Sequence, residues 1–191
     1  MKKLVFFAVL MMGFSIMAVA QDVPAVEVFG GYSYLRVNPP SDMEDADAVS
    51  MNGWDASVAI NGNRWLGFVA DFGGYYDSSS VDFGEESYDQ DVRIHSIMFG
   101  PRFAIRQGKV TPFAHALFGY ARLTSDVEGE EVLHENDFAM AFGGGVDINV
   151  NDRIAVRPVQ VDYLAVKYGL TGDFLNNFRY SAGIVFKFGS R

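Results

Sequence analysis

The three histidines are the residues best suited to nucleophilic or acid–base chemistry, because a histidine beside a serine can activate its hydroxyl group. His95 and Ser96 are adjacent in the sequence, and adjacent side chains of a strand point to opposite faces. His134 lies in an acidic segment without a nearby serine, and His115 has no serine in its own predicted strand. The phosphate-loop, H-E-x-x-H and EF-hand patterns are also missing from the sequence. We therefore expect neither catalytic residues nor a cofactor.

Ionisable side chains recur within stretches that otherwise contain apolar and small residues. If the fold buries them they must pair, because an isolated buried charge costs several kcal/mol. Arg102 is the expected central base, and its candidate partners are Asp71, Asp147 and Asp162. The whole expected ion network comprises Glu27, Asp55, Asp71, Arg102, His115, Asp147, Asp162, Arg179 and Lys187.

Three other segments, 38–51, 78–91 and 125–137, together hold 15 of the 24 acidic residues. Clustered carboxylates suit Ca²⁺ or Mg²⁺, but they are also typical of a solvated surface. The weak metal-ligand candidates are Asp42, Glu44, Asp45, Glu128, Glu130 and Glu131.

The elements that must position these residues are strands, because eight segments alternate apolar with small or polar side chains. Phe138, Met140 and Phe142, for example, alternate with Ala139 and Ala141. No apolar run of 18 residues follows residue 20, so a transmembrane helix is not expected. The eight strands are expected at about 25–37, 52–60, 65–77, 92–105, 111–124, 138–149, 154–166 and 177–188.

The expected connections alternate in length along the chain. The short ones carry Asn61-Gly62 and Gln107-Gly108, which suit the positive φ angles of tight hairpins. This order is typical of an outer-membrane up-and-down barrel with all short turns at one end. The short connections are 61–64, 106–110 and 150–153, and the long ones are 38–51, 78–91, 125–137 and 167–176.

The two strand faces differ in a way that favours a membrane protein. One face carries about thirty large uncharged residues, whereas the other carries the ion network among glycines, alanines and serines. An eight-stranded lumen has room only for the side chains that fill it, so the large apolar face must contact lipid. The predicted fold is an all-β, eight-stranded antiparallel up-and-down transmembrane β-barrel. A soluble barrel with its apolar face inward is the alternative.

The predicted strand 154–166 does not alternate cleanly. If Asp162 faces inward, Arg157 falls on the lipid face. A bulge near Pro158 would bring both inside, since proline interrupts the hydrogen-bond ladder and is tolerated at bulges. Otherwise Arg157 lies near the rim and extends its guanidinium to water.

Residues 1–20 have the three parts of a secretory signal peptide: Lys2 and Lys3, a long apolar run, and Ala18-Val19-Ala20. We expect cleavage after Ala20 and one domain over 21–191, with a retained membrane anchor as the alternative. Cleavage lowers the count of Lys and Arg from 15 to 13 and leaves 24 acids, a net charge near −11. Such an acidic chain has no general attraction for nucleic acid. The chain has no cysteine and therefore no disulfide.

Four short motifs carry a family resemblance over 22–188. They are Val28 to Tyr34, Phe99 to Phe103, Phe142 to Asp147 and the alternating strand Tyr180 to Phe188. With these motifs the chain resembles the OmpA-like/OmpX-like outer-membrane β-barrel domain family. The resemblance implies insertion by the barrel assembly machinery, which reads an aromatic-ended last strand, although here three residues follow Phe188. No periplasmic peptidoglycan-binding domain is expected, so no cell-wall tether is implied.

The expected protein is thus a non-enzymatic barrel of the cell outer membrane, with a structural or surface-interaction role and a lumen plugged by ion pairs. A narrow channel for ions or small solutes is the first alternative, and a lipid-modifying barrel enzyme is the second. The expected partners are outer-membrane lipid and lipopolysaccharide, which divalent cations could bridge to the acidic segments. Adhesion through these segments is a further possibility. A monomer is expected.

Overall fold

A computed structural model of the chain describes residues 23–39, 48–83, 86–127, 130–168 and 173–190. Within these ranges the side chains of 79–90, 127–135, 168 and 173 lie outside the description. The predicted signal peptide, 1–20, also lies outside it. The strands are β1 (Val26–Val37), β2 (Val49–Asn61), β3 (Leu66–Phe83), β4 (Glu86–Ala104), β5 (Val110–Val127), β6 (Glu130–Asn149), β7 (Ile154–Tyr168) and β8 (Asp173–Phe188).

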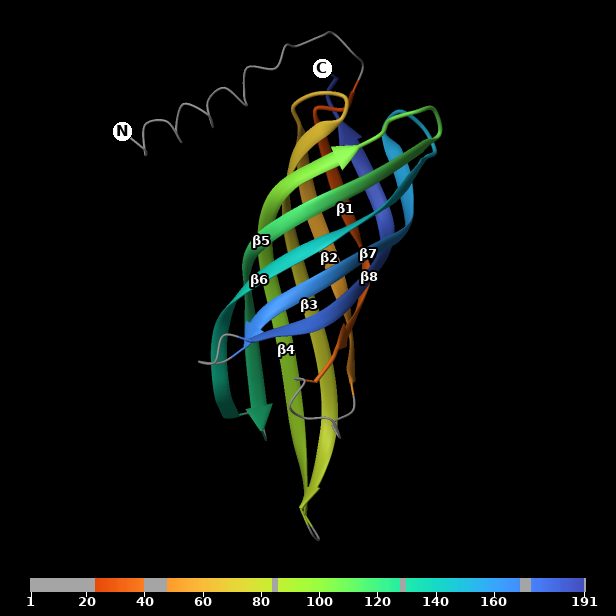
Figure 1. Cartoon of the computed structure of the whole chain (residues 1–191). Helices are drawn as coiled ribbons and strands as arrows, with labels where there is room; N and C mark the ends of the chain where they lie inside the picture. The colour runs from red at the N-terminus through yellow and green to blue at the C-terminus, as the bar shows by residue number, and fades with distance from the viewer. Residues whose placement is uncertain (1–22, 40–47, 84–85, 128–129, 169–172, 191) are drawn as a thin grey trace, which may run out of the picture.

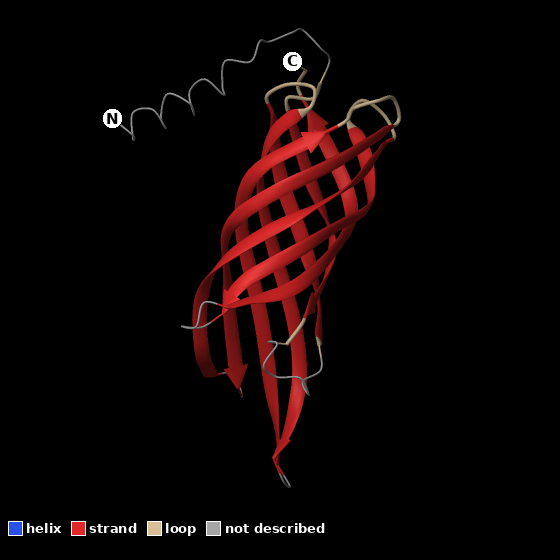
Figure 2. Cartoon of the chain, viewed as in Figure 1, coloured by secondary structure: helices blue, strands red, loops and turns tan. Residues whose placement is uncertain are grey.

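Each strand pairs antiparallel with its neighbours in sequence, and β1 also pairs with β8, so that the sheet closes into a barrel (Figures 1 and 2). Tyr32 of β1, for example, lies opposite Trp54 of β2 and Ala182 of β8. The predicted eight-stranded up-and-down barrel is confirmed. No helix in the described ranges is long and apolar enough to cross a membrane.

The two ends of the barrel differ. At the turn end, which is uppermost in Figure 1 with the C-terminus, the short connections 62–65, 105–109 and 150–153 join β2 to β3, β4 to β5 and β6 to β7. Local chemistry fixes these turns. Asn63 Oδ1 accepts hydrogen bonds from the backbone amides of Trp65 and Leu66 at 2.9 and 2.8 Å. Gly108 adopts a φ of 63°, which glycine tolerates without steric cost.

The opposite end, here called the loop end, carries the remaining connections. The prediction of long loops at 78–91 and 125–137 is wrong, because the described residues of these segments are mostly in strands. The β3–β4 pairing continues to Phe83 and Glu86, and this hairpin extends furthest in Figure 1. Where a hairpin leaves the membrane both faces meet water, so the hydrophobic alternation ends although the backbone ladder continues.

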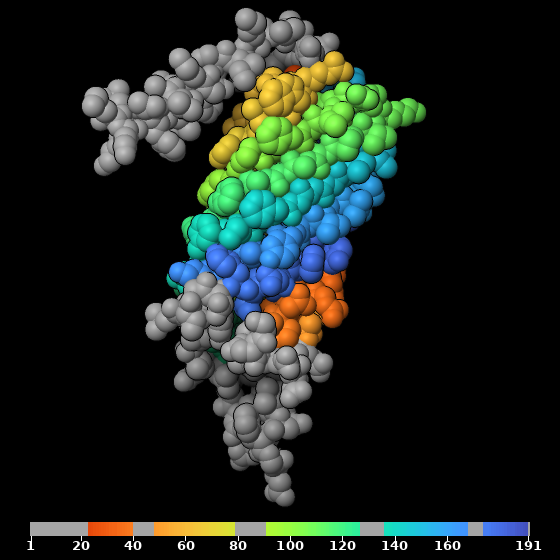
Figure 3. All heavy atoms as spheres, in the orientation of Figure 1, coloured from red at the N-terminus to blue at the C-terminus, as the bar shows by residue number. Residues whose placement is uncertain are grey.

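The outer surface is apolar and the interior is polar, which is the reverse of a soluble barrel. Exposed side chains on the outside include Tyr32, Phe68 and Phe186, at 57%, 56% and 45% exposure. In the space-filling view the strands run obliquely, side by side, over this surface (Figure 3). Inside, Arg179 is fully buried and Glu27 is 3% exposed. The lipid-facing assignment explains this surface.

The irregular strand β7 contains the expected bulge. The register of β7 against β8 shifts between Arg157 and Gln160, on either side of Pro158. Arg157 and Asp162 are consequently both inside, at 3% and 0% exposure. The β6–β7 register shifts nearby, between Val146 and Ile148, so the ladder adjusts on both sides of the proline.

Candidate functional site

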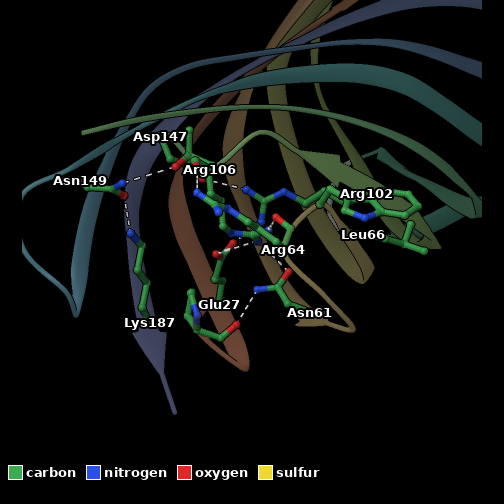
Figure 4. Close-up of polar contacts among 12 residues, drawn as sticks. Glu27, Asn61, Arg64, Leu66, Arg102, Arg106, Asp147, Asn149 and Lys187 are labelled. Atoms are coloured by element: carbon green, nitrogen blue, oxygen red, sulfur yellow. Dashed lines mark hydrogen bonds and ion pairs between the residues drawn. The ribbon is translucent and has the colours of Figure 1, made fainter. Parts of the chain in front are cut away.

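Arg102 of β4 and Arg106 of the connection that follows this strand form the first group of ion pairs, near the turn end. The Arg102 guanidinium donates to Glu27 and, at 2.8 Å, to Asp147 Oδ2. Arg106 Nη2 donates to Glu27 Oε1 at 3.1 Å and to Asn61 Oδ1 at 2.8 Å (Figure 4). With Arg157 these residues make up the turn-end network.

Arg157 completes this network from the β7 bulge. Its Nε donates to Asp147 Oδ1 at 2.7 Å. Its guanidinium carbon lies 4.2 Å from the ring centroid of Phe29 and 4.3 Å from that of Phe113. Aromatic faces attract a guanidinium electrostatically, more strongly when it is desolvated. The two rings therefore hold the cation in place while Asp147 neutralises it.

A second group, the central network, surrounds the fully buried Arg179 of β8. Its Nη1 lies 2.7 Å from Asp71 Oδ1, and its Nη2 lies 2.7 Å from Asp162 Oδ2. His115 Nε2 lies 2.7 Å from the other oxygen of Asp162. Ser181 donates to Asp55 Oδ2 at 2.9 Å. Gln160 is its remaining member.

Gln160 joins the two networks. Its Oε1 accepts a hydrogen bond from Arg157 Nη1 at 2.7 Å, and its Nε2 donates to Asp162 Oδ2 at 2.8 Å. Gly143 makes room for this layer, because a Cβ atom there would lie 2.1 Å from Asp162 Oδ1. Buried hydrogen bonds thus run without a break from Arg106 near the turn end to Asp71 in the barrel centre.

The structure brings together most of the sequence-predicted ion residues but changes two pairings. Arg102 contacts Asp147 as expected, whereas its expected partners Asp71 and Asp162 pair with Arg179 instead. Register explains the difference, because Asp71 lies opposite Met98 of β4. Arg102 is four residues further along that strand, about 13 Å nearer the turn end.

Lys187 lies at the edge of the predicted set. It is half-buried, and its ammonium group donates to Asn149 (Figure 4). Arg106 and Gln160 belong to the networks although the sequence interpretation omitted them. Arg106 follows Arg102 by four residues, so the period-two rule would have placed it on the inward face. Gln160 gave no such signal, since the bulge beside it breaks the alternation.

The two networks carry opposite excesses of charge. The turn-end network has three arginines and two acids, Glu27 and Asp147. The central network has three acids and one arginine, together with His115. Asp55 Oδ1 is buried and has no hydrogen-bond partner. The contact of Arg157 with Gln160 therefore joins a region of excess positive charge to one of excess negative charge.

Towards the loop end the interior becomes apolar. Leu35, Met51, Tyr75, Met98 and Leu164 are at most 1% exposed and belong to one hydrophobic cluster. The Tyr75 hydroxyl faces the central network, because Ser33 Oγ lies 3.4 Å from it and 2.9 Å from Ser181 Oγ. Tyr75 thus separates ionic from apolar interior.

The lumen has a cavity on each side of this packed centre. The turn-end cavity, of about 970 Å³, is lined by polar and charged residues such as Arg64, Lys109 and Lys187. The loop-end pocket, of about 350 Å³, is lined mainly by aliphatic residues such as Val37, Ile94 and Leu123. The networks and the cluster of Tyr75 lie between them.

The remaining chemical candidates are dispersed. His95 is exposed and contacts the Tyr76 hydroxyl at 3.4 Å. Among the described residues, no three acidic or histidine side chains are grouped so that they could hold a metal ion. The weak metal-ligand candidates Asp42, Glu44, Asp45 and Glu128 lie outside the described residues, as do the side chains of Glu130 and Glu131.

The apolar exterior, charged interior and closed antiparallel sheet define the class as a transmembrane β-barrel. The family model of the outer membrane protein beta-barrel domain matches residues 6–188. The chain therefore belongs to this family and is an outer-membrane β-barrel protein.

Solved structures agree on the fold. Neisserial surface protein A is 16% identical, with a TM-score of 0.70, and the match covers 86% of this chain and 97% of that one. Ail, the attachment invasion locus protein of Yersinia pestis, in complex with the heparin analogue sucrose octasulfate, is 18% identical. Its TM-score is 0.60, with 85% and 97% covered. OprG from Pseudomonas aeruginosa is 11% identical, with a TM-score of 0.58 and 88% and 98% covered. No curated protein matches the chain.

Proposed function

We propose that this protein is a non-enzymatic outer-membrane barrel that keeps its lumen closed with ion pairs and interacts with its surroundings through its loop end. The observation that carries the proposal is the composition of the two networks, to which every strand contributes. From β1 to β8 the contributors include Glu27, Asp55, Asp71, Arg102, His115, Asp147, Asp162 and Arg179. Side chains from all sides therefore meet across the lumen, as expected of a plug.

The narrow-channel alternative requires mobile or hydrated charges. Here the arginines of both networks are held by two or more contacts each, and Arg179 is fully buried. Moving an ion through this region would require breaking pairs whose members are then left buried and unpaired, which costs several kcal/mol. This favours a closed lumen over a conducting one.

The enzyme alternative requires a nucleophile within about 3 Å of a base. His115 is engaged by Asp162, and its ring lies 5.8 Å from that of Phe113. His95 contacts Tyr76 on the exposed face. No serine is hydrogen-bonded to either histidine within the part of the chain that is described, which supports the non-enzymatic assignment.

The loop end is the proposed interaction surface, because outer-membrane barrels have short periplasmic turns, and the turns 62–65, 105–109 and 150–153 lie at the opposite end. Segments 38–51, 78–91 and 125–137 hold 15 acids and neither lysine nor arginine. Ail is described with a heparin analogue, but this charge disfavours such a sulfated partner here. The clustered carboxylates of these segments suit divalent cations, which would bridge them to lipopolysaccharide phosphates.

Solute flux into liposomes tests the closed lumen. Liposomes that contain the refolded protein should swell no faster in small sugars or amino acids than empty ones, and their phospholipid and lipid A should stay intact. Rapid swelling would favour the channel, and lipid hydrolysis or acyl transfer that His115→Ala abolishes would favour the enzyme.

A further inference from the structure

The loop-end pocket is a built feature of the barrel interior. Its lining residues come from all eight strands, from Leu35 on β1 to Leu175 on β8. A cavity with walls on every strand lies inside the barrel and faces away from lipid. It is therefore distinct from the apolar outer surface, which membrane insertion already explains.

The lining is unusual for a lumen that is ionic elsewhere. Met51, Ile94, Leu123 and Val166 face the pocket with other aliphatic side chains. On the side of the pocket that faces the turn end, the packed cluster that contains Tyr75 separates it from the central network. Water beside these aliphatic side chains lacks polar partners, so an apolar group that displaces it gains free energy. A volume of about 350 Å³ is at the lower end of small-molecule sites, roughly 300–1,000 Å³.

The charged residues that line the pocket determine which polar head group a ligand with an apolar tail can carry. Asp77 and Asp137 are half-buried acids there, and the exposed Lys167 is the single base in the described lining. In the sequence, the segment 78–91 follows Asp77 and the segment 125–137 ends at Asp137, and both are rich in acids. Clustered charge of one sign raises the local concentration of ligands of the opposite sign. The entrance thus attracts cations and repels carboxylates, sulfates and phosphates.

We infer that the loop-end pocket binds a small amphiphilic cation, with an aliphatic or aromatic group among the apolar side chains and an ammonium group beside Asp77 and Asp137. Binding does not require that the ligand cross the barrel. The inference is therefore independent of the closed lumen, and flux and binding are measured separately.

Three probes with one chain length and different head groups test the inference: hexylammonium, hexan-1-ol and hexanoate. The protein is placed in nanodiscs of zwitterionic lipid with ¹³C-labelled methionine methyl groups. Met51 lines the pocket and reports binding there. Met140 is on the lipid-facing side of β6 and reports partition into the membrane. Hexylammonium should shift the Met51 resonance saturably, should leave Met140 unchanged, and should bind most tightly of the three.

Paired variants separate the head-group and tail contributions. Asp77→Asn and Asp137→Asn should each weaken hexylammonium about two- to fivefold, the size of a partly exposed ion pair, and should leave hexan-1-ol unchanged. Asp152→Asn removes an acid at the turn end and should change neither. Ala121→Phe places a ring in the pocket and should abolish binding of all three probes.

Migration of unboiled samples on gels shows whether each variant is folded. If Ala121→Phe does not fold, the asparagine variants and the Met51 resonance still test binding in the pocket. The absence of a saturable Met51 shift would overturn the site. Hexanoate that binds as tightly as hexylammonium, or asparagine variants without effect, would overturn its preference for cations.

Discussion

The two halves of this lumen are filled in different ways. Between the polar turn-end cavity and the barrel centre, two networks pack arginines and carboxylates almost to the exclusion of solvent, whereas toward the loop end aliphatic side chains surround a pocket of about 350 Å³. Ion pairs in a low-dielectric interior tolerate few gaps, because each unpaired charge is costly. Aliphatic side chains impose no such demand. The ionic half is therefore suited to closing the barrel, and the apolar half is suited to binding.

The largest expected effect comes from the centre of the ionic half. Arg179→Ala leaves Asp71 and Asp162 without their arginine and should lower the free energy of unfolding by about 3–5 kcal/mol. Arg102→Ala should cost less, because Asp147 keeps Arg157 and Glu27 keeps Arg106. Urea titration of refolded protein in lipid vesicles measures both. Equal losses of stability would contradict the claim that the acids of the turn-end network keep a second arginine when one is removed.

The outer face should respond to charge in the opposite way to the lumen. Phe142→Arg puts a cation on the lipid side of β6, where it should cost about 2–4 kcal/mol near the membrane centre. Glu130→Lys, at the loop-end start of β6, should change stability by less than about 0.5 kcal/mol. The same titration compares them, and similar costs at the two positions would contradict the assigned topology.

Matched substitutions in the two halves measure packing directly. Ala155 is fully buried against Phe29 and Val185, so Ala155→Phe should overpack this region and cost about 1–3 kcal/mol. Ala121 borders the pocket, and Ala121→Phe should cost less than about 1 kcal/mol, since the ring enters open space. The difference in urea midpoint between the variants is the readout. A larger loss for Ala121→Phe would mean that the pocket is already filled.

Among the ion pairs, the smallest effect is expected for the pair nearest the loop end. Arg93 pairs with Asp126, but the Arg93 side chain is 44% exposed. Exposed pairs contribute little, so Arg93→Ala should lower stability by less than about 1 kcal/mol, and added salt should reduce this further. Unfolding at low and high ionic strength checks it. A loss as large as that of Arg179→Ala would remove the distinction between buried and exposed pairs.

The sequence predicted the strands within the membrane well, because one face of each is in lipid and the alternation is therefore strong. It failed at 78–91 and 125–137, where the strand pairing continues although the hydrophobic alternation has ended. The sequence correctly predicted that His115 and Asp162 face the interior. The pairing of Arg179 with Asp71 could not be predicted from the sequence. These residues are 108 positions apart, and only the register of the closed sheet brings them together.

Single-channel recording in planar bilayers tests the central claim, that ion pairs close this lumen, most directly. Wild-type protein should carry no steady current, and Arg179→Ala, which removes the arginine at the centre of the plug, should produce intermittent openings. Steady conductance by the wild type, with Arg179→Ala changing ion selectivity but barely changing stability, would contradict the account and identify the lumen as a working pore.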